Sequence, residues 1–241
     1  MATPSAKTAI KATIGRALRE TGVALKSASG TMEIYSTHRP SMVFNGIKPF
    51  KTNDTFVAPT ASVIGDVTNW DASSIWYGAV VRGDSHPVSI GFSSAIQDRC
   101  VISTLPPSIT QLATGFPPVC HVGHYVTVGA GSVLTSCWID DMVVIGEKCT
   151  IMEGALVEKE SILEAGSVVP AYARIPSGER WGGNPAQFIE KIDGGVKEEI
   201  KSTAEGVSEQ AAEHILEFLP YGNSYLHLEE LAKKGVTATK G

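Results

Sequence analysis

Residues 139–169 read IDDMVVIGEKCTIMEGALVEKESILEAGSVV, and this stretch decides the fold. An aliphatic residue returns at every sixth position, at Ile139, Ile145, Ile151, Val157, Leu163 and Val169. A period of six does not match the turn of an α-helix, and it is too regular for the strands of a sandwich. The stretch therefore indicates a repeat architecture built from six-residue units.

The same period extends toward the N-terminus across most of the chain. The series from residue 57 to residue 169 has 17 positions, and 16 of them are Val, Ile or Leu. The earlier members are Val57, Val63, Asn69, Ile75, Val81, Ile90, Ile96, Ile102, Val122, Val128 and Leu134. Four residues after most members stands a small residue, as at Ala61, Ser73, Ala79, Ser94, Ser132, Ala155, Ser161 and Ser167. Chance does not hold a phase for so long.

Such a repeat suits a coil with a triangular cross-section, in which each side is one short strand followed by a turn. Three units make one turn of the coil, and successive turns stack about 4.8 Å apart as parallel strands. The aliphatic positions then form ladders inside the prism. Hexapeptide repeats of this kind resemble the left-handed parallel β-helix, so residues 57–185 are predicted to form an all-β domain of that type. The handedness comes from the resemblance and not from the spacing.

Two interruptions break the period. The first runs from Arg82 to Ser89 and is three residues longer than a regular unit. The second runs from Ser103 to His121 and contains four prolines. Both are predicted to be loops that leave the coil, and in repeat proteins insertions gather on the binding face.

The two ends of the chain differ from its middle. Residues 1–25 begin with a basic stretch that has no acid up to Arg19. Ile10, Ile14 and Leu18 fall on one helical face of this segment, which predicts a basic amphipathic helix. We expect this helix to dock on a partner or a membrane surface. The pattern also resembles a mitochondrial targeting sequence. Residues 26–56 are predicted to be an irregular lead-in. Residues 186–241 are predicted to be a long helix along the prism, interrupted near Gly194, followed by a polar tail.

Composition narrows the classes of function. The chain of 241 residues is 43% hydrophobic with a net charge of −5, which does not suit a protein that coats nucleic acid. It has no apolar run of the roughly 18 residues that a membrane span requires. The four cysteines, Cys100, Cys120, Cys137 and Cys149, contain no CxxC pair and are predicted to be buried, reduced thiols.

Five motifs within residues 56–186 resemble the γ-class carbonic anhydrase family, and in particular its plant and algal mitochondrial members attached to respiratory complex I. The motifs are FVAPTASVIGDV at 56–67, SIWYGAVVRGD at 74–84, IQD at 96–98, VTVG at 126–129 and IPSGERWGGNPA at 175–186. The hexapeptide period alone is shared with acyltransferases and nucleotidyltransferases. The RGD, QD and WGGNP motifs narrow the resemblance to this family.

The resemblance implies a zinc site that this chain does not retain. Active members hold zinc with three histidines near a trimer interface, two from one subunit and one from its neighbour. Three imidazoles and an open position lower the pKa of bound water to about 7. The first histidine falls six residues after the Gln of the QD motif, and the others follow VTVG as His-x-x-x-x-His. These positions are Ser103, Ala130 and Thr135 here, and none of these side chains replaces imidazole. No metal cofactor is therefore expected in this chain's own site.

Four residues of the family's pocket are nevertheless present: Arg82, Asp84, Gln97 and Asp98. Their retention without the histidines favours a structural role, with Arg82 and Asp84 as a salt bridge at a buried subunit contact. Three histidines remain as alternatives. His121 and His124 are interpreted as surface turn residues that reach a metal only if the coil is rearranged. His86 lies in the first interruption, where hexapeptide acyltransferases place a catalytic base.

The resemblance and the missing ligands together predict a non-catalytic subunit of a γ-carbonic-anhydrase-like heterotrimer. It would lie on the matrix side of the mitochondrial inner membrane as a peripheral protein bound to the membrane arm of complex I, with no nucleic acid partner. Three other functions stay open: carbon dioxide hydration with substitute or partner ligands, acyl transfer with His86 as base, and bicarbonate binding at Arg82.

Overall fold

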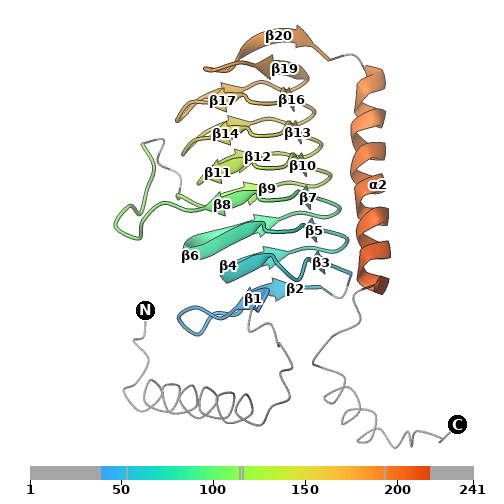
Figure 1. The fold of residues 1–241 in the computed structure, drawn as a ribbon. Coiled ribbons are helices and arrows are strands. Elements are labelled where there is room, and N and C mark those ends of the chain that lie inside the picture. Colours follow the sequence, from blue (N-terminus) through green and yellow to red (C-terminus); the bar gives the residue numbers. More distant parts are fainter. Residues whose placement is uncertain (1–38, 53, 114, 116, 193, 218–241) are drawn as a thin grey trace, which may run out of the picture.

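The computed structural model describes residues 39–52, 54–113, 115, 117–192 and 194–217. These residues form a three-sided prism of stacked coils with one long helix along its side (Figure 1). The fold is the predicted left-handed parallel β-helix of hexapeptide repeats. The helix predicted within residues 1–25 and the tail after residue 217 lie outside the described residues.

The first face of the prism is an eight-stranded sheet, in which very short parallel strands are followed by one antiparallel strand at the C-terminal end. Its strands are β3 (Phe56–Val57), β5 (Ser74–Ile75), β7 (Ala95–Ile96), β10 (Thr127–Val128), β13 (Val144–Ile145), β16 (Ile162–Leu163), β19 (Glu179–Gly182) and β20 (Gln187–Lys191).

The second and third faces are joined into one twelve-stranded sheet, because β4 (Ser62–Asn69) and β6 (Val80–Ile90) continue around the corner between them. The second face also holds β1 (Ser41–Met42), β8 (Val101–Ser103), β11 (Val133–Thr135), β14 (Thr150–Ile151) and β17 (Val168–Val169). The third face also holds β2 (Phe50–Lys51), β9 (Cys120–Val122), β12 (Trp138–Ile139), β15 (Leu156–Val157) and β18 (Arg174–Ile175).

The aliphatic series fills the interior of the prism. Every member except Val57 is at most 1% exposed, and Asn69 occupies its position in the series at 1% exposure. Members pair in register from coil to coil, as Ile102 does with Leu134 and Leu134 with Ile151. The small residues of the series are also buried, and two of their hydroxyls donate to carbonyls of the next coil, Ser94 to Gly123 and Ser132 to Gly146. The core thus follows from the six-residue period.

The two interruptions behave differently from each other. The first was predicted to be a loop, but Arg82 to Ser89 lies within β6, which pairs with β4 before and after the corner. Gly65 pairs with Gly83 and Val67 with Val88, so the extra residues form a bulge opposite Asp66. A corner accepts extra residues without loss of strand pairing, which is why the prediction was wrong. The second interruption does leave the prism, between β8 and β9 (Figure 1).

The prism extends beyond the predicted range 57–185 at both ends. At the N-terminal end, β1 and β2 pair with β4, so part of the predicted irregular lead-in belongs to the prism. At the C-terminal end, residues 187–191 form β20 instead of the first turns of a helix. The apolar spacing of Phe188, Ile189 and Ile192 suggested a helix, but pairing with the otherwise open edge of β19 satisfies more backbone groups.

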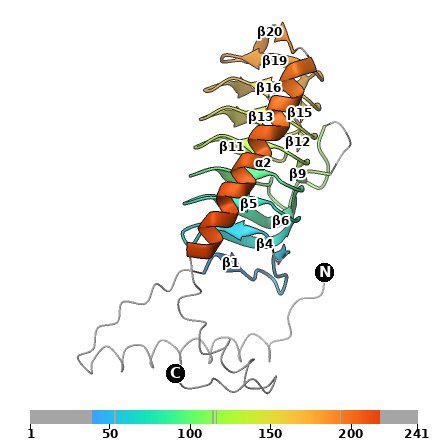
Figure 2. The same ribbon diagram turned by 90° about the vertical axis from the view of Figure 1, so that its right-hand side faces the viewer.

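The helix α2 (Gly194–Glu217) runs diagonally across the first face, and Figure 2 views it from that side. Its own residues Ile200, Ala204 and Ala211 are buried. His214 packs in an aromatic cluster with Phe56, Trp76 and Tyr77. The hydroxyl of Tyr77 lies 2.9 Å from Nδ1 of His214. The predicted packing of the C-terminal helix along the prism is confirmed for residues 194–217.

The four cysteines are buried and unpaired, as predicted. Cys120 and Cys137 lie on neighbouring coils with their sulfur atoms 4.0 Å apart. Among the described residues, no helix combines the length and the apolar character needed to span a membrane.

Candidate functional site

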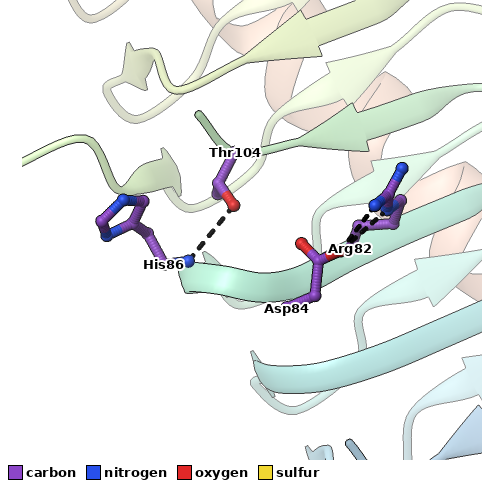
Figure 3. A network of polar contacts seen from close by, with 4 residues as sticks. All are labelled: Arg82, Asp84, His86 and Thr104. Carbon is purple, nitrogen blue, oxygen red and sulfur yellow. Dashed lines mark hydrogen bonds and ion pairs between the residues drawn. The ribbon is translucent and has the colours of Figure 1, made fainter. Parts of the chain in front are cut away.

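Arg82 and Asp84 form an ion pair on β6 (Figure 3). Nη2 of Arg82 lies 2.6 Å and Nε 3.2 Å from Oδ2 of Asp84. Burial alone would raise the pKa of Asp84, but hydrogen bonding and the charge of Arg82, with backbone N–H donors, outweigh burial and lower it. The Arg82 side chain is 52% exposed, so within one chain this is a surface ion pair worth about 0–1 kcal/mol. The burial predicted for the pair is not present in the single chain.

Gln97 and Asp98 lie at a different corner of the prism, directly after β7 on the first face. Oδ1 of Asp98 accepts the backbone N–H of Tyr77 at 2.9 Å, and the Asp98 carbonyl accepts that of Gly131 at 2.8 Å. A small cavity of about 200 Å³ beside α2 is lined by Trp76, Gln97, Asp98, Val207 and Gln210. Asp98 therefore ties together neighbouring coils at the first corner, and both residues border the cavity beside the helix.

The four retained residues do not meet in one chain. Gln97 and Asp98 follow the first face, whereas Arg82 and Asp84 lie where the second face turns into the third. The width of the second face separates the two pairs. A single site that uses all four residues needs two chains.

The three positions that the resemblance assigns to metal ligands lie at the edges of the second face. Ser103 and Thr135 end β8 and β11 and pair in register, so they are neighbours on successive coils. Ala130 lies at the opposite edge, just after β10, where its carbonyl accepts the N–H of Lys148. All three are half-buried.

The donor atoms at these positions do not suit zinc. A methyl group offers no lone pair, and neutral hydroxyls are poor zinc ligands beside imidazole, thiolate or carboxylate. In the part of the chain that the structure describes, no three His, Cys, Asp or Glu side chains lie together as a metal site. The residues present therefore do not fit the metal of active family members.

His121 and His124 both have a hydrogen bond at Nδ1. His121 lies within β9, where Nδ1 is 2.6 Å from Oγ of Ser89 and the ring stacks on Trp138 at 4.2 Å. Burial lowers the pKa of His121, although Asp140 and Asp141 oppose this shift. His124 is exposed, and its Nδ1 accepts the backbone N–H of Phe92. His124 is a surface turn residue as predicted, whereas His121 is a half-buried strand residue.

Figure 3 also shows how His86 is held. Its backbone N–H donates to Oγ1 of Thr104 at 3.3 Å, which links the β6 bulge to the start of the long loop. Nε2 of His86 is buried and has no hydrogen-bond partner among the described residues. The sequence did not predict the contacts of Thr104 or Ser89, because each contact spans an interruption of the period.

Individual relatives, and not a family model, show which family the chain belongs to. No family model matches the chain. It is 47% identical to the mitochondrial γ-carbonic-anhydrase-like protein 1 of Arabidopsis thaliana, across 75% of this chain and 70% of that protein. It is 40% identical to mitochondrial γ-carbonic anhydrase 2 of the same plant, across 74% of this chain and 63% of that protein.

The fold has relatives among solved structures. A hexapeptide transferase family protein from Anaplasma phagocytophilum is 29% identical with a TM-score of 0.64, across 71% of this chain and 95% of that one. This likeness agrees with the stacked six-residue coils, and the sequence relatives separate the chain from the transferases. The chain belongs to the family of γ-carbonic anhydrases and γ-carbonic-anhydrase-like proteins.

Proposed function

We propose that this chain is a non-catalytic, structural subunit of a γ-carbonic-anhydrase-like trimer that is attached to the membrane arm of mitochondrial complex I. One feature carries the proposal: Ser103, Ala130 and Thr135 stand at the three positions that the resemblance assigns to the zinc ligands of the family. Without imidazole at these positions, the chain cannot generate the metal-bound hydroxide on which carbon dioxide hydration depends.

The second face supports association with related subunits. No described helix covers this face, and five outward residues share one register, namely Val80, Val101, Val133, Thr150 and Val168, of which all but Thr150 are apolar. A flat apolar strip of this kind favours packing against another prism. The ligand positions lie at both edges of the same face, as a site shared between two chains requires.

This arrangement fixes how many zinc sites a mixed trimer retains. Each site of such a trimer lies between two neighbours, and one copy of this chain takes part in two of the three contacts. It supplies no ligand at either contact, so a trimer with two active subunits retains at most one complete site. A homotrimer of this chain has none.

The proposed location rests on the relatives and on the N-terminal sequence. Both plant relatives are named as mitochondrial proteins. The basic amphipathic pattern within residues 1–25 is our candidate for the contact with the membrane arm or its lipid on the matrix side.

Deletion of residues 1–25 is expected to release the subunit from complex I, because it removes the basic apolar face. The measurement is co-migration with complex I on native gels of mitochondria that express either form, with import supplied by an independent targeting sequence. Removal of residues 232–241 serves as the control and should leave co-migration unchanged. Full attachment of the shorter form would contradict the assignment of this segment.

The purified protein is expected to retain far less than one zinc ion per chain and to leave carbon dioxide hydration at its uncatalysed rate. Elemental analysis after dialysis and stopped-flow hydration assays measure the two quantities. A family member that carries all three histidines, purified in parallel, shows that the procedure preserves zinc. One zinc ion per chain in this protein, or measurable catalysis of carbon dioxide hydration, would contradict the proposal.

The other functions find less support. For acyl transfer, the candidate base His86 has its Nε2 buried within the chain. For bicarbonate binding, the Arg82 guanidinium is already paired with Asp84. Neither group is placed as these functions need it.

A further inference from the structure

Residues 39–51 form a hairpin at the N-terminal end of the prism, here called the basic hairpin. Its two ends, β1 and β2, pair with β4. Between them, Phe44 and Ile47 exchange two backbone hydrogen bonds of 3.0 and 2.9 Å around a turn formed by Asn45 and Gly46. Both turn residues have positive φ angles, as a tight two-residue hairpin turn requires. The tip is therefore a defined structure and not a loose loop.

The tip of the basic hairpin exposes apolar side chains. Val43, Phe44, Ile47 and Phe50 are 60%, 42%, 48% and 56% exposed. Scattered exposed apolar residues are normal on a protein surface, but four within eight consecutive positions are a local concentration, here called the patch. Figure 1 shows the loop between β1 and β2 extending beyond the strands of the coil above it. The loop projects from the prism, as a segment that enters another surface must.

The hairpin itself carries charge of one sign. Arg39, Lys48 and Lys51 are exposed, and residues 39–51 contain no acid, although the whole chain has a net charge of −5. No ion pair of the described residues uses these three cations. Trp70 follows Asn69, the residue paired with Lys51, and is 52% exposed. Asp54, Asp66 and Asp71 lie outside the hairpin, and Asp66 is at the corner of β4 between the residues that pair with β1 and β2.

We propose that the basic hairpin docks on an anionic lipid bilayer, with Phe44 and Ile47 entering the headgroup region and Lys48 and Lys51 beside the lipid phosphates. Exposed aromatic and aliphatic residues next to cations and a tryptophan are typical of interfacial membrane contacts. A protein groove would have to match both the apolar tip and the cations next to it, whereas an anionic bilayer offers both chemistries over a continuous surface. The proposal concerns lipid alone and does not depend on complex I.

Insertion is tested by a fluorescent probe on the full chain. The native cysteines are buried, so a maleimide derivative of the environment-sensitive fluorophore NBD attaches to the introduced thiol of Phe44→Cys. Vesicles of phosphatidylcholine with phosphatidylglycerol should shift its emission to the blue, and brominated lipid should quench it. The matched control is Phe188→Cys, which is 50% exposed at the other end of the prism and should not respond.

Flotation of the full chain with the same vesicles measures the contribution to binding. The double variant Phe44→Asp, Ile47→Asp should reduce partitioning at least roughly tenfold, because two apolar side chains that enter the bilayer are lost. The control Phe188→Asp, Ile189→Asp removes similar exposed groups and should leave partitioning unchanged. Lys48→Glu, Lys51→Glu should weaken binding about fivefold per cation, and only to anionic vesicles. Lys148→Glu, Lys159→Glu is the charge control.

Three results would overturn the proposal. One is an equal response of the probes at positions 44 and 188. A second is unchanged partitioning of the hairpin variants, which would leave another segment responsible for binding. The third is a probe at position 44 that is already shielded before vesicles are added, because the patch would then be covered by residues 1–38 or by a second copy. Loss of complex I attachment alone changes none of these readouts.

Discussion

The triple variant Ser103→His, Ala130→His, Thr135→His is expected to bind about one zinc ion per chain, where the unmodified protein binds almost none. Ser103 and Thr135 pair in register on neighbouring coils, about 4.8 Å apart, which lets two imidazoles reach one ion. Ala130 lies at the other edge of the second face, from which a neighbouring subunit can supply the third ligand. Three imidazoles around one open position are a complete ligand set for zinc, so the change in zinc content should be large.

Zinc content after dialysis and the mass of the assembly in solution measure this result together. The matched control is the double variant Ser103→His, Thr135→His, which provides two ligands per site and should lose its zinc on dialysis. The triple variant should also bind zinc only as a trimer. A folded, trimeric triple variant without zinc would show that these three positions are not the family's ligand positions. That result would remove the observation on which the proposed function depends.

Leu134→Ala is expected to lower the free energy of unfolding by about 2–5 kcal/mol. The Leu134 side chain is fully buried between Ile102 and Ile151 in the ladder of the second face, so its loss leaves a cavity. Neighbouring coils cannot close this cavity, because their backbone spacing is fixed by the hydrogen bonds between strands. Each coil is stabilised by its contacts with the neighbouring coils, so the substitution should lower the stability of the whole prism.

Urea unfolding followed by circular dichroism measures this loss. Leu156→Ala makes the same chemical change at an outward, half-buried position on the third face and should cost about 1 kcal/mol or less. Leu156 lies on neither the face beneath α2 nor the face proposed to join subunits. Its substitution should therefore not change subunit association, and the two losses of unfolding free energy can be compared directly. Equal losses for the two leucines would mean that the ladder does not carry the stability of the prism.

Most of the fold could be predicted because one local rule repeats. The spacing of residues such as Ile139, Ile145 and Ile151 fixes both the period and the inward side of each strand. The rule fails where the chain leaves the period. Residues 187–191 have a spacing that suits a helix, and only the open edge of β19 makes them a strand. The bulge in β6 keeps its strand pairing, although its length alone suggests a loop.

The candidate site could be predicted only in part for the same reason. The adjacency of Ser103 and Thr135 follows from the in-register pairing of Ile102 with Leu134. The hydrogen bonds from His86 to Thr104 and between Ser89 and His121 join residues across the interruptions, where no period predicts which coils meet. The separation of Arg82 from Gln97 across the second face also required the structure, because the sequence does not show where each corner lies.

The antiparallel pairing of β20 with β19 has a consequence for self-assembly. A stack of parallel coils could in principle grow without limit, since the last coil offers the same edge as the one before it. Because β20 runs opposite to the other strands of its sheet, an incoming prism would meet a strand of the wrong direction for parallel pairing. The five exposed residues of β20, QFIEK, also include charged and polar side chains. The reversed strand therefore opposes end-to-end polymerisation into fibres at the first face, whereas the other two faces end in the parallel strands β17 and β18.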